Sequence, residues 1–478
     1  MKKVIICLFS LLLMASCADN LDDFNVDTKS PTNVPPATLF TGAVKNLTDV
    51  LTTPNVNTNN YRFYVQYWTS TQYLDEPRYN MTSRLIPQNM WNTLYRDVLA
   101  DLKDSKRIVQ EDEITPEKVK SNEMAQIGIM EVYAWSVLVN TFGDVPYSEA
   151  LDSNNPLPKY DDAQTIYNDL LTRLDASLAM INTDAAGFEE GDVLYGGDMS
   201  KWVKFGNSLK LEMALTLADV DASKAQTLAQ EAADKVLESR EDNAAFVYLP
   251  APPNNNPVSQ NINPLFTSRK DFVAANTLVD IMNTLEDPRR PAYFTQVDGK
   301  YIGGKYGFQN AYANFSTVNP TITDPTFEAL LMSYSQVEFM LAEAAARGYT
   351  VPGTVEEHYN NGVTASILYW GGTAAEAAAY LARPAVNYAT AAGDWKQKIG
   401  VQEWIALYNR GYDAWLTWRR LDAPNLLPPA IEGSEQLIVP TRLIYPVNEQ
   451  TLNGANRAAA ATAIGGDKSS THLWWDVQ

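Results

Sequence analysis

The sequence predicts a mostly α-helical protein made of stacked helical hairpins and interrupted by loop-rich insertions. Apolar residues recur at helical spacing over several segments of about twenty residues, and short turns separate these segments. Between about residues 244 and 325 the helical pattern gives way to Gly, Asn, Pro and aromatic residues. With 478 residues and 45% hydrophobic content, the chain can fill one large core or two ordinary ones.

The N-terminus has the pattern of a lipoprotein signal peptide. Lys2 and Lys3 precede an apolar run over residues 4–14 that is too short to span a bilayer, and small residues then lead to Cys17. A chain cut before Cys17 keeps one cysteine, which cannot form an internal disulfide but can carry acyl chains such as palmitate. We therefore expect a signal peptide over residues 1–16 and lipidation of Cys17. The alternative is an ordinary signal peptide that ends near a cysteine by chance.

The segment that follows the cysteine predicts a flexible tether. Residues 17–36 are acidic and rich in Pro and Asn, with no periodicity, so we expect a single folded domain over residues 37–478. The net charge of −20 argues against nucleic acid and anionic lipid as partners. No later run of apolar residues is long enough to span a bilayer, so the lipid is the only membrane attachment that we expect.

Seven segments carry helical periodicity. The clearest, residues 122–142, places its apolar residues on one face and stops at Gly143, a good C-cap. The next begins with Asp161 as its predicted N-cap, and the last sixty residues look irregular. Helix lengths and short turns suggest tetratricopeptide-like hairpins, although no fixed repeat is visible. The predicted helices cover residues 122–142, 161–181, 201–219, 223–238, 325–347, 354–370 and 396–418.

The residues that most enzymes need are scarce. Two histidines, far apart in sequence, exclude a multi-histidine metal site, and we interpret His358 as a surface residue. No GxSxG motif occurs. Residues 299–305 read GKYIGGK, but Tyr306 stands where a phosphate-binding loop has Ser or Thr, and the flanking segments are unsuitable. We expect no catalytic residues, no metal and no cofactor. No sequence signal distinguishes a catalytic carboxylate pair among the many acids.

Aromatic residues are the positive signal. Nine fall between Tyr61 and Tyr95, and seven fall between Tyr293 and Phe315 in a Gly- and Asn-rich context. Rings with polar tips suit ligands that stack on one face and form hydrogen bonds at the edge. Packing between helices is the alternative role for any one of these rings. A third group, Trp404, Trp415 and Trp418, lies on a helical pattern, and we expect it to pack in the core with Arg419 and Arg420 stacked on neighbouring rings.

Several blocks resemble the SusD/RagB outer-membrane lipoproteins, in particular the SusD-like branch described as "starch-binding associating with outer membrane". In order along the chain they are residues 17–36 (CADNLDDFNVDTKSPTNVPP), 66–80 (QYWTSTQYLDEPRYN), 138–151 (LVNTFGDVPYSEAL), 158–171 (PKYDDAQTIYNDLL), 196–215 (GGDMSKWVKFGNSLKLEMAL), 400–424 (GVQEWIALYNRGYDAWLTWRRLDAP), 438–453 (IVPTRLIYPVNEQTLN) and 473–476 (LWWD).

This resemblance implies a mostly helical fold with tetratricopeptide-like hairpins and a position on the outer-membrane surface of a Gram-negative bacterium. It also implies a partner, a SusC-like TonB-dependent transporter, over which the lipoprotein acts as a hinged lid. The lid would capture an oligosaccharide, or in some members an oligopeptide, and deliver it for import without catalysis. Because ligand aromatics of the family lie in variable loops, the candidate ligand residues are Trp68, Tyr73, Arg78, Tyr79, Tyr306, Phe308 and Tyr312. Part of the first group lies in a family-like block, which leaves a scaffold role open for it.

Two other function classes remain as alternatives. One is a surface glycoside hydrolase, which would turn over glycans through a pair of carboxylates. The other is a helical-repeat scaffold that has only protein partners.

Overall fold

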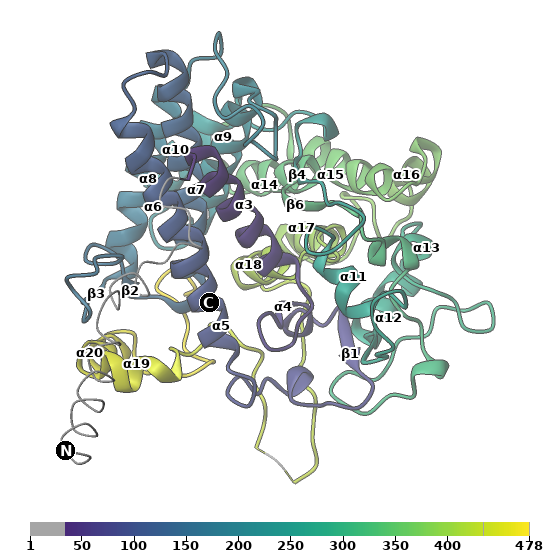
Figure 1. The fold of residues 1–478 in the computed structure, drawn as a ribbon. Helices are drawn as coiled ribbons and strands as arrows, with labels where there is room; N and C mark the ends of the chain where they lie inside the picture. Colours follow the sequence, from purple (N-terminus) through teal and green to yellow (C-terminus); the bar gives the residue numbers. More distant parts are fainter. Residues whose placement is uncertain (1–33, 434, 478) are drawn as a thin grey trace, which may run out of the picture. The chain divides into compact units, whose positions relative to one another are not determined.

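Helices make up most of the chain that the structure describes, as the sequence predicts (Figure 1). This computed structural model describes residues 34–433 and 435–477. The chain from Pro36 to Gln478 is one compact unit. The predicted signal peptide, Cys17 and nearly all of the predicted tether lie outside the described residues, so these expectations stay predictions.

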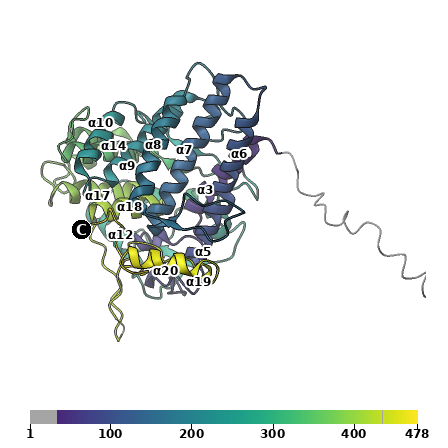
Figure 2. The same cartoon turned by 90° about the vertical axis from the view of Figure 1, so that its left-hand side faces the viewer.

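The N-terminal half stacks consecutive helices side by side. In Figure 2, α6, α7, α8 and α9 stand in a row, each in contact with the next. A π-helical stretch, η2, joins α5 to α6 without a break in the helical backbone. The bounds are α3 (Pro36–Thr52), α4 (Tyr61–Tyr64), α5 (Ile86–Asn92), η2 (Thr93–Leu99), α6 (Ala100–Glu111), α7 (Glu117–Phe142), α8 (Ala163–Met180), α9 (Met199–Thr216) and α10 (Ala222–Ala232).

Helix α7 is the central helix of this stack. Every residue from Ala125 to Phe142 is buried, so the helix packs on all sides rather than along the one apolar face that the sequence suggested. It ends at Phe142 because Gly143 takes a positive φ of 84°. The next helix, α8, begins one residue later than predicted. Asp162 is its N-cap and accepts from the Thr165 N–H at 2.8 Å, whereas Asp161 accepts from the Ser148 N–H at 2.7 Å.

The C-terminal half continues the stack with α14 against α9. The predicted helix over residues 354–370 is confirmed as α15, with Thr354 and Glu357 in a capping box. Tyr359, Val363 and Ile367 of α15 belong to a small second core cluster between α14 and α17. The bounds are α14 (Tyr334–Ala346), α15 (Val355–Tyr369), α16 (Ala374–Leu381), α17 (Trp395–Ala406), α18 (Gly411–Leu421), α19 (Val447–Leu452) and α20 (Gly454–Ala463).

The structure differs from three sequence expectations for this half: where one helix begins, whether another is continuous, and whether the C-terminal residues are irregular. The helix predicted from residue 325 begins at Tyr334, because residues 329–332 pair instead with a distant strand. The helix predicted over residues 396–418 is broken into α17 and α18, because the Arg62 guanidinium donates to both the backbone and the side-chain oxygen of Asn409. The last sixty residues contain α19 and α20 rather than irregular chain alone.

Short elements lie between the longer helices, and they include three two-stranded antiparallel sheets. Trp68 faces Ala274 in the β1–β5 pair, Val145 faces Asp161 in β2–β3, and Phe246 faces Ala329 in β4–β6. The bounds are β1 (Trp68–Ser70), η1 (Glu76–Arg78), β2 (Val145–Pro146), β3 (Tyr160–Asp161), η3 (Arg240–Asp242), β4 (Ala244–Phe246), α11 (Pro257–Ile262), β5 (Phe272–Ala274), α12 (Asn276–Thr284), α13 (Arg290–Tyr293), η4 (Tyr312–Asn314), η5 (Pro320–Thr323) and β6 (Ala329–Met332).

The tryptophan prediction is confirmed in its main part. Trp404 and Trp415 are fully buried in the core, Trp418 is half-buried, and the Arg419 guanidinium lies 3.5 Å from the centroid of the Trp415 ring. Arg420 differs from expectation, because its Nε donates to the Glu343 carboxylate at 2.9 Å.

The histidine prediction is wrong. His358 is buried, with Nδ1 2.7 Å from the Glu338 carboxylate. An acid on the neighbouring helix α14 therefore explains a histidine that periodicity alone placed on the surface.

Candidate functional site

The fold brings the two aromatic clusters of the sequence together. Strand β1 pairs with β5, and the segment that follows Gly304 then runs alongside residues 69–78. The Asn310 side chain donates to the Ser70 carbonyl at 3.1 Å, and the Arg78 Nε donates to the Gly307 carbonyl at 3.0 Å. Segments more than two hundred residues apart thus form one surface, which we call the loop face and define as residues 72–80 with residues 305–312.

Three of the seven predicted ligand residues lie beneath this face. Trp68 is fully buried, stacks on Phe272 with ring centroids 5.7 Å apart, and donates its indole N–H to the Tyr408 hydroxyl at 3.2 Å. The Tyr306 hydroxyl donates to the Phe63 carbonyl at 2.6 Å, and the rings of Tyr306 and Tyr79 lie 6.3 Å apart. These three side chains therefore support the face from within, contrary to the expectation that they offer rings to a ligand.

Burial also sets the ionisation of these phenols. Loss of water around the Tyr79 hydroxyl raises its pKa to about 12, and the same cause raises the pKa of Tyr306 well above its usual value. Both hydroxyls therefore stay neutral at physiological pH, and that of Tyr306 donates a hydrogen bond inside the protein.

The other four predicted residues reach the surface. Tyr73 is 52% exposed, and Arg78, Phe308 and Tyr312 are half-buried. The three rings each have a cation over one face, at 5.5 Å for Arg84 on Tyr73, 3.8 Å for Lys305 on Phe308 and 5.3 Å for Lys270 on Tyr312. These contacts orient the rings, and the basic residues supply donors beside them. The ligand role of the four residues stays a prediction.

The close approach of Gly303 to α12 fixes the position of the second segment. A Cβ atom at residue 303 would lie 2.3 Å from the Asn276 Cα and 2.6 Å from its nitrogen. In addition, the Tyr306 N–H donates to the Asn276 side chain at 2.9 Å. The start of α12 thus holds residues 303–306, from which Phe308 and Tyr312 follow.

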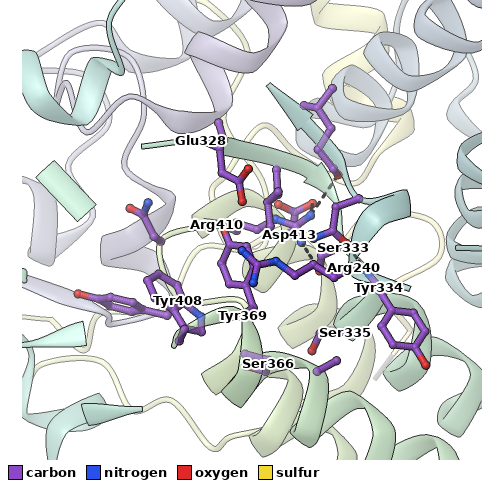
Figure 3. Close-up of a pocket in the computed structure, with 18 of the residues that line it drawn as sticks. Arg240, Glu328, Ser333, Tyr334, Ser335, Ser366, Tyr369, Tyr408, Arg410 and Asp413 are labelled. Carbon is purple, nitrogen blue, oxygen red and sulfur yellow. Dashed lines mark hydrogen bonds and ion pairs between the residues drawn. The ribbon is translucent and has the colours of Figure 1, made fainter. Parts of the chain in front are cut away.

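A separate cavity of about 510 Å³ lies between β6, α15 and the turn from α17 to α18 (Figure 3). Phe327, Tyr369 and Trp370 form aromatic walls, and Arg240 and Glu328 contribute charged groups. None of the seven predicted residues lines this cavity. Sequence reasoning missed it because its lining comes from segments scattered between residues 51 and 413, with no local motif.

Neither a metal site nor a membrane span is found among the described residues. Within residues 34–433 and 435–477, no group of three or more His, Cys, Asp or Glu side chains could hold a metal ion. Over the same residues, no helix is both long enough and apolar enough to cross a membrane.

Comparisons with known proteins agree with the architecture. The family model described as "Starch-binding associating with outer membrane", SusD-like, matches residues 28–446. No curated protein matches the chain. Many solved structures do, and all three described next superpose over nearly their whole length.

A structure titled "chitin-binding protein" is 28% identical with a TM-score of 0.81, and the match covers 93% of this chain and 100% of that one. A SusD homologue from Bacteroides uniformis is 26% identical with a TM-score of 0.75, covering 92% and 99%. A chitin-binding SusD homologue from Flavobacterium johnsoniae is 24% identical with a TM-score of 0.76, also covering 92% and 99%, and shows the shared fold. Because the family model matches most of this chain and the helical fold agrees with the solved structures, the chain belongs to the SusD-like family.

Proposed function

We propose that this protein is a non-catalytic, surface-exposed lipoprotein of the outer membrane that binds oligosaccharides, or oligopeptides, on its loop face. In this proposal Cys17 carries the lipid, residues 17–36 form the tether, and the domain closes as a lid over a SusC-like TonB-dependent transporter. The main support is that two aromatic segments far apart in sequence form the loop face. Each surface ring of this face has a cationic side chain over one side. A relative 28% identical to this chain is named a chitin-binding protein, which supports a glycan as the first ligand to test.

The rings and cations of the loop face suit a sugar chain. A pyranose ring presents an apolar face that stacks on an aromatic ring, while its hydroxyls form hydrogen bonds at the edge. Tyr73, Phe308 and Tyr312 offer rings, and Arg78 offers guanidinium nitrogens beyond the Nε that Gly307 occupies. Flat stacking with few directional bonds gives modest affinity, which a lid that must release its ligand requires.

The first test removes two of the surface rings. The double substitution Tyr73→Ala with Phe308→Ala should weaken binding of chitin oligosaccharides or malto-oligosaccharides at least tenfold, or about 1.4 kcal/mol, as measured by isothermal titration calorimetry. Ile114→Ala is the control, because its side chain is 93% exposed and lies in the turn between α6 and α7. If the double variant folds and binds as tightly as the wild type, the loop face is not the binding site.

A second test addresses the anchor and the partner. Cys17→Ala should move the protein from the membrane fraction to the soluble fraction, and the wild type should copurify with a transporter barrel. A protein that stays in the membrane fraction after Cys17→Ala would contradict lipidation at that residue.

Two carboxyl groups with raised pKa values bear on the hydrolase alternative. Carboxyls with strongly raised pKa values are candidates for general acids, and burial raises the pKa of Glu403 to about 8 and that of Glu212 to about 7. Both side chains lie in the helical core, where Gln336 donates to Glu212 and Thr417 donates to Glu403. The hydrolase would be favoured if purified protein turned over a glycan and one Asp or Glu substitution abolished that turnover. The scaffold would be favoured if the protein bound no glycan or peptide but still copurified with a barrel.

A further inference from the structure

The loop face does not account for the cavity of about 510 Å³, which has the size of a site for a small ligand. Its mouth is marked by exposed residues, Arg240, Glu241 and Leu368, and its inner end by the buried side chains of Ser335, Ser366 and Tyr408. The break between α17 and α18 helps to form it, because Tyr408 and Arg410 lie in that break and line the cavity.

Many of the polar groups in the lining already have protein partners. The Arg410 guanidinium donates to the Ser333 hydroxyl and the Leu331 carbonyl, each at 3.1 Å, and forms an ion pair with Asp413 at 3.1 Å. The Ser335 hydroxyl donates to the Gly362 carbonyl at 2.8 Å. These groups build the wall and leave little capacity for a ligand.

Arg240 and Glu328, two charged groups of opposite sign in the lining, lack such charged partners among the residues that the structure describes. Within the described chain, neither Arg240 nor Glu328 has an oppositely charged side chain within 4.0 Å. Both lie against Tyr369. The Arg240 guanidinium is 5.3 Å from the centroid of the Tyr369 ring, and the Glu328 carboxylate is near enough to the Tyr369 hydroxyl to add to the raised pKa that burial gives this phenol. Figure 3 shows the Arg240, Glu328 and Tyr369 side chains close to one another in the lining, with Arg240 coming from the exposed mouth.

Two nitrogens of the cavity wall have no hydrogen-bond partner among the described residues. The Nε of Arg410 and the indole Nε1 of Trp370 are both buried without a hydrogen-bond partner in the described chain, and both residues line the cavity. A buried donor without a partner costs free energy, so these two nitrogens leave the wall of the cavity with unsatisfied polar groups. Beside Trp370, the rings of Phe327 and Trp370 stack with centroids 6.0 Å apart and provide an apolar wall.

We propose that this cavity binds a small zwitterion, a free amino acid or dipeptide with an apolar side chain, at Arg240 and Glu328. The ligand ammonium donates to Glu328, whose two carboxylate oxygens are hydrogen-bond acceptors. The ligand carboxylate accepts from the Arg240 guanidinium, whose planar donors suit a carboxylate. The apolar side chain packs against Phe327 and Trp370. A neutral sugar would leave both charges without an opposite charge, and a simple carboxylate would leave Glu328 without one.

The exposed acids at the mouth of the cavity do not compete with Glu328 for the ligand ammonium. Glu238 is paired with Lys204 at 2.7 Å, and Glu241 is exposed at the mouth, whereas the Glu328 side chain is half-buried in the lining. The Asp413 carboxylate is paired with Arg410, so Glu328 is the acid of the lining that is left for an ammonium group.

The test is isothermal titration calorimetry of the purified full chain with leucine, phenylalanine and the dipeptide Leu-Phe. At least one should bind, whereas N-acetyl-phenylalanine, which lacks the ammonium, and phenylalaninamide, which lacks the carboxylate, should bind at least tenfold more weakly than phenylalanine. Arg240→Gln should weaken zwitterion binding at least tenfold without further weakening the amide, and Glu328→Gln should do the same without further weakening the N-acetyl compound. Glu241→Gln is the matched control at the mouth and should leave the affinity unchanged.

Two results would overturn the proposal. One is that none of the three zwitterions binds the wild-type chain. The other is that they bind equally well to folded Arg240→Gln and Glu328→Gln proteins, with folding checked by circular dichroism. Binding of glycan alone, lost in the Tyr73→Ala and Phe308→Ala protein, would overturn this cavity assignment while leaving the loop face in place.

Discussion

Single buried residues decide how this chain responds to pH. Glu403 is fully buried, 4.0 Å from Arg420, and burial raises its pKa to about 8 against an ordinary value of 4.5. Glu212 is also buried, and the same cause raises its pKa to about 7. The folded state therefore binds protons at neutral pH that the unfolded chain has already released. The contribution of such a group to stability is fully present below the unfolded pKa and is lost as the pH rises through the folded pKa.

A single substitution tests this at the residue scale. Glu403→Gln keeps the shape of the side chain and removes its titration, so the free energy of unfolding of the wild type should fall relative to that of the variant between about pH 5 and pH 8. The expected slope is up to about 1.4 kcal/mol per pH unit. Urea unfolding at pH 5, 6.5 and 8 measures it, and parallel curves for the two proteins would contradict the raised pKa.

The elements are positioned by contacts that sequence periodicity does not contain. Arg62 of α4 breaks the predicted helix at Asn409, and β4 converts the start of another predicted helix into β6. Both changes help to shape the cavity, since Asn409, Leu330 and Leu331 line it. The loop face depends in the same way on α12, against which Gly303 packs without room for a side chain.

Gly303→Ala tests the link between an element and the loop face. The added methyl group would meet backbone atoms of Asn276, which cannot swing aside as a side chain could, so the substitution should lower the free energy of unfolding by about 1–3 kcal/mol. It should also weaken glycan binding, because Phe308 and Tyr312 follow on the displaced segment.

The control for this substitution is Gly454→Ala in α20, where nothing lies within 4 Å of the new Cβ. It should change stability by about 0.5 kcal/mol or less. Thermal and urea unfolding measure the stability of both variants, and calorimetry measures their binding. Equal stability and equal affinity of the two variants would show that the close approach to α12 does not position the face.

At the scale of the whole molecule, the C-terminal segment is joined to the central helix. Arg442 is fully buried, donates to the Phe142 carbonyl at 2.9 Å and pairs with Asp467 at 2.7 Å. The Leu443 N–H donates to the Thr141 carbonyl at 2.9 Å. One continuous core cluster runs from Phe40 to Ala460, so residues from both ends of the described chain share one hydrophobic interior.

This arrangement predicts cooperative loss of structure. Arg442→Met removes the donors to the Phe142 carbonyl at the end of α7 and one of the two arginine partners of Asp467, which keeps Arg457, and should lower the free energy of unfolding by about 1–3 kcal/mol. Differential scanning calorimetry should show one transition that shifts as a unit. Arg383→Met, which removes an exposed ion pair with Glu286, is the control and should cost about 1 kcal/mol or less. A separate early transition in the Arg442 variant would show that the C-terminal segment unfolds independently.

The sequence by itself determined the local features of this protein. Periodicity located the long helices, Gly143 and Thr354 marked a helix end and a helix start, and clustering pointed to two aromatic segments, because each of these signals lies within a few residues of its consequence. The ordered blocks also indicated the SusD-like family, which the match over residues 28–446 confirms.

Only the tertiary structure decided which side chains could act. Trp68 and Tyr73 are five residues apart in the same cluster, yet one is fully buried against Phe272 and the other is 52% exposed. Burial is a property of contacts between distant segments, such as that between residues 68–80 and 304–312, and no local pattern encodes it. The same reason hid the cavity, where Arg240, Glu328 and Tyr369 meet although they come from three separate parts of the chain.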